Sequence, residues 1–435
     1  MKLAPALHDI AGAVHSFQRW GPASVRKEAG RCLFCFDAPC RADCPAGIDV
    51  PSFIRRILHE NPRGASELIR RENPLGWLCG ILCPVERLCT SHCPRAKMDK
   101  AIDIGGLQAF ASGPIREAKL SSRTRSRRRV AVVGAGPSGL SAAFYLSQGG
   151  VDVDLFEANT FPGGLITFGI RPDKIEKREA LKEMEALISD NRISLHLRKR
   201  VADPRQLTAG NDAVYVATGL GAEGVPGNLL QYRNVFSATA FLRNVNEAAL
   251  RDRPYRKRLD EPVFIIGGGN TAMDAAITAK RLGAADVTVV YRRTEAEMPA
   301  WKYEIKATQN AGVIFRFLLE PASFRGRKDR LYDVVFRSMR LGDLGPDGRR
   351  KAIPVVGRTL ILKAGTLILA TGREAARPPW LAREAVGVSS GRLGESRVWI
   401  GGELRQGGGL IVRAVADGKR AAQEILTALE KRNSV

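Results

Sequence analysis

The sequence predicts an α/β protein in which two Rossmann-like dinucleotide-binding domains follow a small α-helical domain. Three observations lead to this prediction. All eight cysteines lie between residues 32 and 93, a glycine-rich strand–turn–helix pattern occupies residues 129–157, and a second copy of that pattern occupies residues 263–293. A strand that runs into a glycine turn and then a helix is typical of a parallel, doubly wound sheet.

Composition excludes several classes of protein. The 435 residues are enough for two to three domains with cores of their own. The sequence contains no run of eighteen apolar residues, so no membrane contact is expected. His8 and Asp9 stand where a signal peptide would carry its apolar segment. We therefore expect a cytoplasmic protein, in which disulfides are rare.

The formal net charge of +23 raises the question of nucleic acid. The basic residues are scattered, however, and neither a basic stretch interleaved with aromatic residues nor a zinc-finger spacing occurs, so we expect no nucleic-acid partner. The densest basic run, Arg123–Arg129, precedes an apolar strand, where a domain linker is expected. This run is either a solvated linker or a docking face for an acidic electron-transfer partner.

The cysteines form two sets of four, each closing with Cys-Pro. The spacings are C-x2-C-x4-C-x3-C-P and C-x3-C-x5-C-x3-C-P. Structural zinc prefers two CxxC pairs, and only Cys32 and Cys35 form one. The pattern is closer to that of a two-cluster ferredoxin, in which the fourth cysteine of each run binds the other cluster. We expect two iron–sulfur clusters, with zinc as the alternative; the two sets are Cys32, Cys35, Cys40 and Cys44, then Cys79, Cys83, Cys89 and Cys93.

The segment between the two cysteine sets has apolar residues at helical spacing. Asp49 is expected to cap a helix that begins near Pro51, and Asn61-Pro62 interrupts the pattern. The first 125 residues therefore predict a small helical domain built around its clusters, whose apolar stripes form its core.

The first glycine motif reads "RVAVVGAGPSGL" and opens at residue 129. Its first two glycines let the backbone turn and approach a pyrophosphate, which the following helix N-terminus stabilises. Glu157 ends the next strand, where an acidic side chain can bind ribose hydroxyls. The residues expected to contact this nucleotide are Gly134, Gly136, Pro137, Ser138, Gly139 and Glu157.

The second motif reads "VFIIGGGNTAMD" and ends its second strand with Tyr291-Arg292-Arg293, without an acid. An acid there would repel a 2′-phosphate, whereas guanidinium groups can bind it bidentately. This difference favours NADPH, and NADH remains possible. The residues expected to contact this coenzyme are Gly267, Gly269, Asn270, Thr271, Arg292 and Arg293.

Near its end the chain has a strand, a glycine-rich loop and an amphipathic helix, in "VWIGGELRQGGGLIVRAVADG". So late a glycine loop indicates that the chain returns to complete the first nucleotide domain, so that the second is inserted in it. The expected domains are 1–125 (helical, with two iron–sulfur clusters), 126–248 (first nucleotide-binding domain, first part), 249–363 (NAD(P)H-binding) and 364–435 (first nucleotide-binding domain, second part); the resemblance described next implies that the first nucleotide is FAD.

These motifs together resemble a known family. "RCLFCFDAPC", "CGILCPVERLC", "IDIGGLQAFA", "VAVVGAGPSGL", "PGGL" and "VVYRRTEAEMPA" are similar to segments of the glutamate synthase small (beta) subunit and of the NADPH-oxidising half of dihydropyrimidine dehydrogenase. The resemblance covers residues 28–424, and it is greatest to the separate small subunit of bacterial dihydropyrimidine dehydrogenase. It implies FAD, two [4Fe-4S] clusters and a nicotinamide coenzyme in one chain.

The resemblance also implies individual site residues. Gln108 in "IGGLQ" is expected to replace Cys79 as the fourth ligand of the second cluster, which leaves Cys79 as a packed bystander. The usual Asp of the late flavin-binding strand is replaced by Glu403, a longer acid. The remaining residues expected at the flavin are Gly164, Leu165, Gly402, Glu403, Gly409, Leu410 and Ile411, and the expected cluster ligands are Cys32, Cys35, Cys40, Cys44, Cys83, Cys89, Cys93 and Gln108.

The predicted function is that of an iron–sulfur flavoprotein oxidoreductase that passes electrons from NAD(P)H to a partner. No catalytic acid or base is expected, because hydride passes directly between stacked rings. A disulfide reductase would need a cysteine pair beyond Cys93, and none occurs. The expected partner is an FMN-containing, pyrimidine-reducing subunit. The alternatives are a glutamate synthase large subunit or a ferredoxin.

Overall fold

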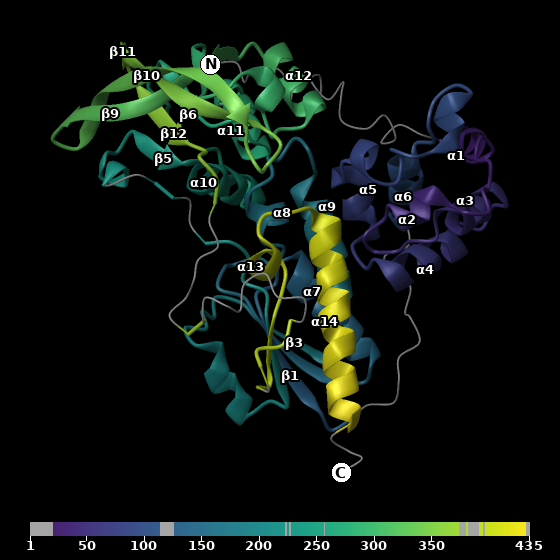
Figure 1. Ribbon diagram of the computed structural model, residues 1–435. Coiled ribbons are helices and arrows are strands. Elements are labelled where there is room, and N and C mark those ends of the chain that lie inside the picture. The colour runs from purple at the N-terminus through teal and green to yellow at the C-terminus, as the bar shows by residue number, and fades with distance from the viewer. Residues whose placement is uncertain are drawn as a thin grey trace. The chain divides into compact units, whose positions relative to one another are not determined.

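The computed structural model describes residues 21–113, 126–221, 224–225, 228–255, 257–373, 380–381, 391–394 and 396–431 (Figure 1). The sequence-based predictions for residues 1–20 and for positions 123–125 of the basic run concern residues outside these ranges. The described residues divide into two compact units. The first comprises 21–167, 174–221 and the described residues from 380 onward, and the second comprises 168–173 and 224–373.

The first unit begins with short helices around the cysteines. Three of these helices start at a side-chain cap: Asp49 Oδ1 accepts the Ser52 N–H at 3.1 Å before α3, and Asn61 and Asp103 cap α4 and α6 in the same way. The expected cap at Asp49 is therefore confirmed. The elements are α1 (Pro22–Ala29), α2 (Pro39–Ala42), α3 (Val50–Leu58), α4 (Pro62–Glu72), α5 (Gly76–Leu82), η2 (Val85–Arg87), η3 (Pro94–Lys97) and α6 (Ile104–Ser112).

The rest of the first unit is a five-stranded parallel sheet in the order β13-β4-β1-β2-β3. Strand β13 arrives from the far end of the chain and pairs with β4, with Val398 opposite Val214. Helix α14 packs against α7, and Figure 1 shows it as the long yellow helix. The elements are β1 (Arg129–Val133), α7 (Pro137–Gln148), β2 (Asp152–Phe156), α8 (Leu165–Phe168, whose last residue belongs to the second unit), α9 (Lys177–Ile188), β3 (Ile193–His196), η4 (Pro204–Ala209), β4 (Ala213–Val216), β13 (Val398–Ile400), α13 (Glu403–Gln406) and α14 (Ile411–Lys431).

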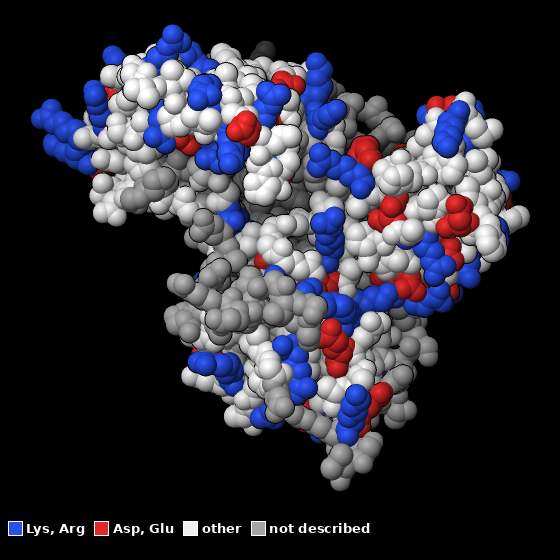
Figure 2. Space-filling model, viewed as in Figure 1, with Lys and Arg blue, Asp and Glu red and all other residues white. Residues whose placement is uncertain are grey.

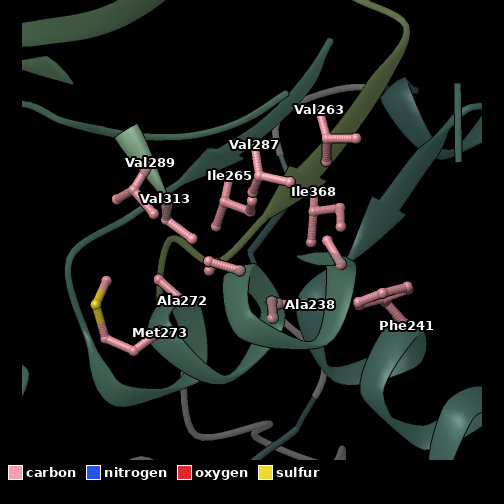
Figure 3. Close-up of a cluster of buried hydrophobic side chains, with 14 of the residues drawn as sticks. Ala238, Phe241, Val263, Ile265, Ala272, Met273, Val287, Val289, Val313 and Ile368 are labelled. Atoms are coloured by element: carbon pink, nitrogen blue, oxygen red, sulfur yellow. The ribbon is translucent and has the colours of Figure 1, made fainter. Parts of the chain in front are cut away.

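The second unit contains another five-stranded parallel sheet, in the order β5-β12-β6-β7-β8. Figure 3 shows its core, where Ile265 and Val289 of adjacent strands face Ala272 and Met273 of α11, with Phe241 of α10 alongside. The elements are η5 (Leu229–Gln231), β5 (Val235–Ser237), α10 (Ala238–Leu250), β6 (Val263–Ile266), α11 (Asn270–Arg281), β7 (Val287–Tyr291), η6 (Glu295–Glu297), α12 (Lys302–Asn310), β8 (Ile314–Phe317) and β12 (Thr366–Leu369).

A three-stranded antiparallel sheet is attached to the second unit, in the order β11-β10-β9. Its apolar side chains Leu331, Val334 and Phe336 are buried with Phe264 of β6 and Leu367 of β12. Its strands are β9 (Leu319–Arg327), β10 (Arg330–Leu344) and β11 (Arg350–Lys363).

The two parallel sheets and the late return of β13 confirm the predicted fold class, with one dinucleotide-binding fold inserted in the other. The unit boundaries differ from the sequence-based domain boundaries at 248/249 and 363/364. Strands β5 and β12 pair with each other and β12 with β6, so they and α10 lie in the second unit. Among the described residues, every helix is too short or too polar to cross a membrane.

Candidate cofactor sites

The first glycine loop joins β1 to α7 in a tight turn. Gly134 has φ +102°, and a Cβ there would lie 2.5 Å from the carbonyl oxygen of Ala217. A Cβ at Gly139 would lie 1.8 Å from the oxygen of Gly134, so the helix can approach the strand only without a side chain. A Cβ at Gly136 would meet no atom within 4 Å. The backbone at the first turn of α7 is therefore open to a phosphate group.

Glu157 follows β2 and is buried beside this loop. Its Oε2 accepts the Ala135 N–H at 3.0 Å, and its Oε1 accepts the Asn159 N–H at 2.7 Å. The carboxylate therefore lies against the glycine loop, at the end of the strand adjacent to β1. This is the place where an acid binds nucleotide ribose in such folds.

The segment after Glu157 returns to the same loop. The Gly163 N–H donates to the Ala135 oxygen at 2.7 Å, and a Cβ at Gly164 would lie 3.2 Å from the Cα of Gly136. Gly163 and Gly164 both have positive φ. Leu165 is partly exposed at the start of α8. The structure thus brings Gly164 together with the first motif.

The late flavin segment meets the first motif from the other side. Gly402 has φ +61°, and a Cβ there would lie 3.1 Å from the Cβ of Ser138. The Gly402 N–H donates to Asp417 Oδ2 at 2.5 Å. Glu403 Oε1 accepts the Gly409 N–H at 3.3 Å, so the longer acid reaches the loop that leads into α14.

Asp417 is the residue at this site that sequence reasoning missed. It is buried on α14, where it accepts hydrogen bonds from Arg405, Gln406 and Arg420 as well as from Gly402. A single acid in an amphipathic helix gives no local sequence signal. Only its contact with a residue fifteen positions earlier makes its role visible.

The second glycine loop repeats the backbone geometry of the first. Gly267 has φ +145°, and a Cβ there would lie 2.2 Å from the Ala370 oxygen. Gly269 caps α11 and has open space beside it. Asn270 Oδ1 accepts the Trp301 N–H at 2.9 Å. The next residue, Thr271, lies in the first turn of α11.

The two arginines after β7 lie in different environments. Arg292 is half-exposed and pairs with Glu320 at 3.2 Å. Arg293 is buried, and its Nε donates to the Arg350 oxygen at 2.5 Å. Of the two, Arg292 is the side chain that can turn toward a phosphate, whereas Arg293 is held by β11.

Four of the eight cysteines line one pocket. Cys32, Cys35, Cys40 and Cys93 surround it together with Pro39, Pro94 and Ile54. Burial raises the pKa of the Cys32 thiol, and it raises that of Cys40 to about 12. These four side chains are the set that the sequence assigns to one cluster.

The other cysteines are more deeply placed. Cys79 and Cys83 are buried, and a hydrogen bond between their side chains is the main factor raising the pKa of Cys83. Burial also raises the pKa of Cys44, and it raises that of Cys89 to about 12. Gln108 is buried on α6, and its Nε2 donates to the Gly76 oxygen at 2.7 Å.

This donor set fits iron–sulfur clusters. Buried thiols with raised pKa values are neutral by themselves, and a cationic metal favours their thiolate form. Within the described residues no three His, Cys, Asp or Glu side chains are grouped so that they could hold a single metal ion.

The helical part and the flavin part of the first unit are joined at the second cysteine group. Glu183 of α9 accepts the N–H groups of Trp77 and Leu78 at 2.9 and 3.0 Å, and so caps α5, which carries Cys79. Leu410, Ile411 and Val412, at the start of α14, pack into the core around the cysteines. The second group therefore lies next to the flavin part of the chain.

These features define a flavin- and nicotinamide-dependent iron–sulfur oxidoreductase, and comparison with known proteins agrees. Residues 128–398 match the family model of the pyridine nucleotide-disulphide oxidoreductases, and residues 14–120 match dihydropyrimidine dehydrogenase domain II, 4Fe-4S cluster. The chain belongs to the pyridine nucleotide-disulphide oxidoreductase family, in the branch that carries this 4Fe-4S domain.

Particular relatives narrow the comparison. The NAD-dependent dihydropyrimidine dehydrogenase subunit PreT of Escherichia coli K12 is 33% identical over 93% of this chain and 94% of its own length. The glutamate synthase [NADPH] small chain of the same organism is 29% identical over 96% of this chain and 94% of its own length. Two longer oxidoreductases of that organism are 31% and 32% identical, and the chain spans 69% and 65% of their lengths.

Solved structures share the fold. Mycobacterium tuberculosis FprA in complex with NADPH matches with a TM-score of 0.60 at 20% identity, over 72% of this chain and 86% of that one.

The resemblance to the glutamate synthase and dihydropyrimidine dehydrogenase subunits is confirmed by the relatives above, as is the oxidoreductase class.

Proposed function

We propose that this chain is the electron-supplying small subunit of an NAD(P)-dependent dihydropyrimidine dehydrogenase. The observation that carries the proposal is the similarity to PreT over more than nine-tenths of both chains. That similarity coincides with two nucleotide loops and two cysteine groups in one polypeptide. PreT is a subunit, which supports a separate partner that holds the acceptor site.

FAD is assigned to the first unit. Gly134, Gly136 and the first turn of α7 would hold its pyrophosphate, and Glu157 its ribose. The segment that begins at Gly402 and Glu403 would line its phosphate–ribityl region, because Gly402 lies against Ser138 of α7. FAD supplies the conversion between a two-electron hydride and single electrons. The protein's part is to orient the rings and exclude water, so no residue is assigned as a catalytic acid or base.

NADPH is assigned to the second unit, with NADH as the alternative. Gly267, Gly269 and the start of α11 would hold its pyrophosphate, with Asn270 and Thr271 at the helix N-terminus. Arg292 is the side chain free enough to meet a 2′-phosphate, although it must exchange its partner Glu320 for that group. PreT is named for NAD, so the coenzyme must be measured.

Two [4Fe-4S] clusters are assigned to the helical part of the first unit. Cys32, Cys35, Cys40 and Cys93 would hold one cluster, at a surface loop where Leu33 and Phe36 are exposed. Cys44, Cys83, Cys89 and Gln108 would hold the other, beside the flavin part. The first group is the one that a partner can approach.

The fourth ligand of the second cluster is a testable choice. We expect Gln108→Ala to lose about half of the cluster iron, since Gln108 would be a ligand. We expect Cys79→Ala to keep its iron, because Cys79 would only pack beside Cys83 and accept a hydrogen bond from it. Iron content and cluster absorbance decide between them. Cluster loss in Cys79→Ala but not in Gln108→Ala would reverse the assignment.

The proposed function is tested with the purified chain. It should oxidise NADPH with an artificial dye, yet reduce neither uracil nor 2-oxoglutarate plus glutamine. Adding a flavin-containing, pyrimidine-reducing subunit should restore uracil reduction. Substantial turnover of either substrate by the single chain would show that it holds an acceptor site of its own.

A glutamate synthase small subunit is the second candidate. The match to that protein covers 94% of its length, and the segment "YRRTEAEMPA" resembles it equally. A glutaminase-type large subunit that restores glutamate formation, while the pyrimidine-reducing subunit restores nothing, would select this candidate. Direct reduction of a ferredoxin by the chain would select the third candidate, an NAD(P)H:ferredoxin-type oxidoreductase.

A further inference from the structure

The edge strand β11 of the antiparallel sheet carries basic residues and no acidic ones. Strand β11 is 14 residues long and lies at one end of the order β11-β10-β9. Its sequence, "RKAIPVVGRTLILK", has four basic residues and no acid. No cofactor assigned above uses this strand.

The cations of β11 are not neutralised locally. Within the described part of the chain, none of the four forms an ion pair within 4.0 Å. The other two strands add further basic residues, and residues 319–363 contain eleven basic against five acidic side chains. In Figure 2, basic side chains outnumber acidic ones over the part of the molecule that Figure 1 labels β9 to β11. The four cations are Arg350, Lys351, Arg358 and Lys363.

Apolar side chains are exposed among these cations. Val356 is 97% exposed, and Ile361 is half-exposed. Leu360 is also exposed, and Tyr332 and Leu344 of the neighbouring β10 are exposed as well. An exposed apolar patch rimmed by polar and charged side chains is typical of a protein interaction site.

The backbone of β11 explains how Val356 protrudes. Thr359 pairs with Arg337, but the next pair joins Pro354 to Met339, so residues 355–358 bulge out of the ladder. Gly357 has φ +74°, which a residue with a side chain rarely adopts. A bulge, a proline and lysines protect an edge strand from pairing with other strands. The edge is therefore suited to side-chain contact and not to strand addition.

From these observations we propose that the β11 edge is a docking surface for an acidic protein. Charge complementarity selects this partner: these four cations, which form no ion pair with any residue that the structure describes, attract carboxylates and speed the encounter. The exposed aliphatic side chains would supply the contact that holds the complex. The inference does not depend on the proposed function, because it rests on charge and exposure alone.

The charge test uses a matched pair of variants. The β11 variant carries Lys351→Glu, Arg358→Glu and Lys363→Glu. The control carries Lys199→Glu, Arg200→Glu and Lys306→Glu, which are exposed and make the same change in net charge elsewhere. The probe is an acidic plant-type ferredoxin, and its Kd is measured at low and physiological salt. We expect the β11 variant to weaken binding at least about tenfold and to flatten the salt dependence, with little change in the control.

Further arms separate the other outcomes. Val356→Ser with Ile361→Ser should weaken ferredoxin binding severalfold without changing its salt dependence. Equal weakening in the control would mean that net charge alone attracts the probe, and would overturn the proposal. So would a β11-dependent affinity for duplex DNA or phosphatidylserine vesicles while ferredoxin binding is unchanged. NADPH–dye turnover of each variant shows that it is folded, and its absence in the unmodified chain would contradict the proposed function instead.

Discussion

The two glycine loops have the same backbone and different chemistry. Gly134 and Gly267 both have positive φ, and a Cβ at either would collide with the carbonyl oxygen of an alanine in a neighbouring strand segment. The third position differs: a Cβ at Gly139 would lie 1.8 Å from an oxygen, whereas Ala272 fits fully buried. The turn is therefore required by packing in both loops, but the helix lies closer to its strand in the first.

The side chain at the end of the second strand differs more between the two folds. Buried Glu157 follows the second strand of the first fold and accepts a hydrogen bond from its glycine loop, whereas half-exposed Arg292 follows the second strand of the other fold and pairs with Glu320. Under the proposed assignment, strand and helix packing fixes where each dinucleotide would lie, and the side chain at the end of the second strand would select which dinucleotide binds. Three changes test this comparison.

The largest effect is expected from exchanging the third positions. Gly139→Ala places a Cβ against the Gly134 oxygen and should destabilise the first unit by about 3 kcal/mol or more, with loss of bound FAD. Ala272→Gly should cost only about 1 kcal/mol and retain coenzyme use. Flavin content and thermal unfolding measure both. Similar losses in the two variants would show that the helices are equally close.

A smaller effect is expected at Glu157. Glu157→Gln removes a charged acceptor from the Ala135 and Asn159 N–H groups and from the ribose, worth about 1.5–3 kcal/mol. FAD affinity should fall by about tenfold to a hundredfold, as measured by flavin release on dilution. Arg292→Gln is the control and should leave FAD affinity unchanged. Unaltered affinity in Glu157→Gln would exclude a ribose contact.

The smallest effect is expected from the arginines. Arg292→Ala should raise the KM for NADPH by about tenfold. One charged hydrogen bond to the 2′-phosphate would be lost, but its contribution is reduced because Arg292 must first leave Glu320. NADH should be barely affected. Arg293→Ala should change both coenzymes alike, since Arg293 is held by the Arg350 carbonyl. If NADH is the better substrate of the unmodified chain, the assignment of NADPH fails.

The fold was largely predictable because its signals are local. Strand, glycine turn and helix occur in succession within thirty residues in each nucleotide fold, and the cysteine spacings are equally compact. The boundaries of the units were not predictable from the sequence. Strands β5 and β12 belong to the second unit because they pair with each other, and about 130 residues separate them in the chain. Neither strand differs in composition from those of the first sheet.

The candidate sites divide in the same way. The residues of the glycine motifs and the pocket of Cys32 and Cys93 could be named from spacing. Asp417 could not, because it reaches Gly402 only once α14 has folded against the sheet. The basic edge of β11 was also invisible, since the net charge gives no location until the strand is seen unpaired.

The return of β13 and α14 also has a consequence for synthesis of the chain. The N-terminus of the chain leaves the ribosome first, and domains generally fold as units as they emerge. The second unit is nearly contiguous, so it can fold while the first sheet still lacks β13. The Val398–Val214 pairing and the packing of Val412 into the cysteine core can form only later. The nicotinamide fold should therefore resist protease on stalled chains that end before residue 398, while the flavin fold remains open and unable to retain FAD.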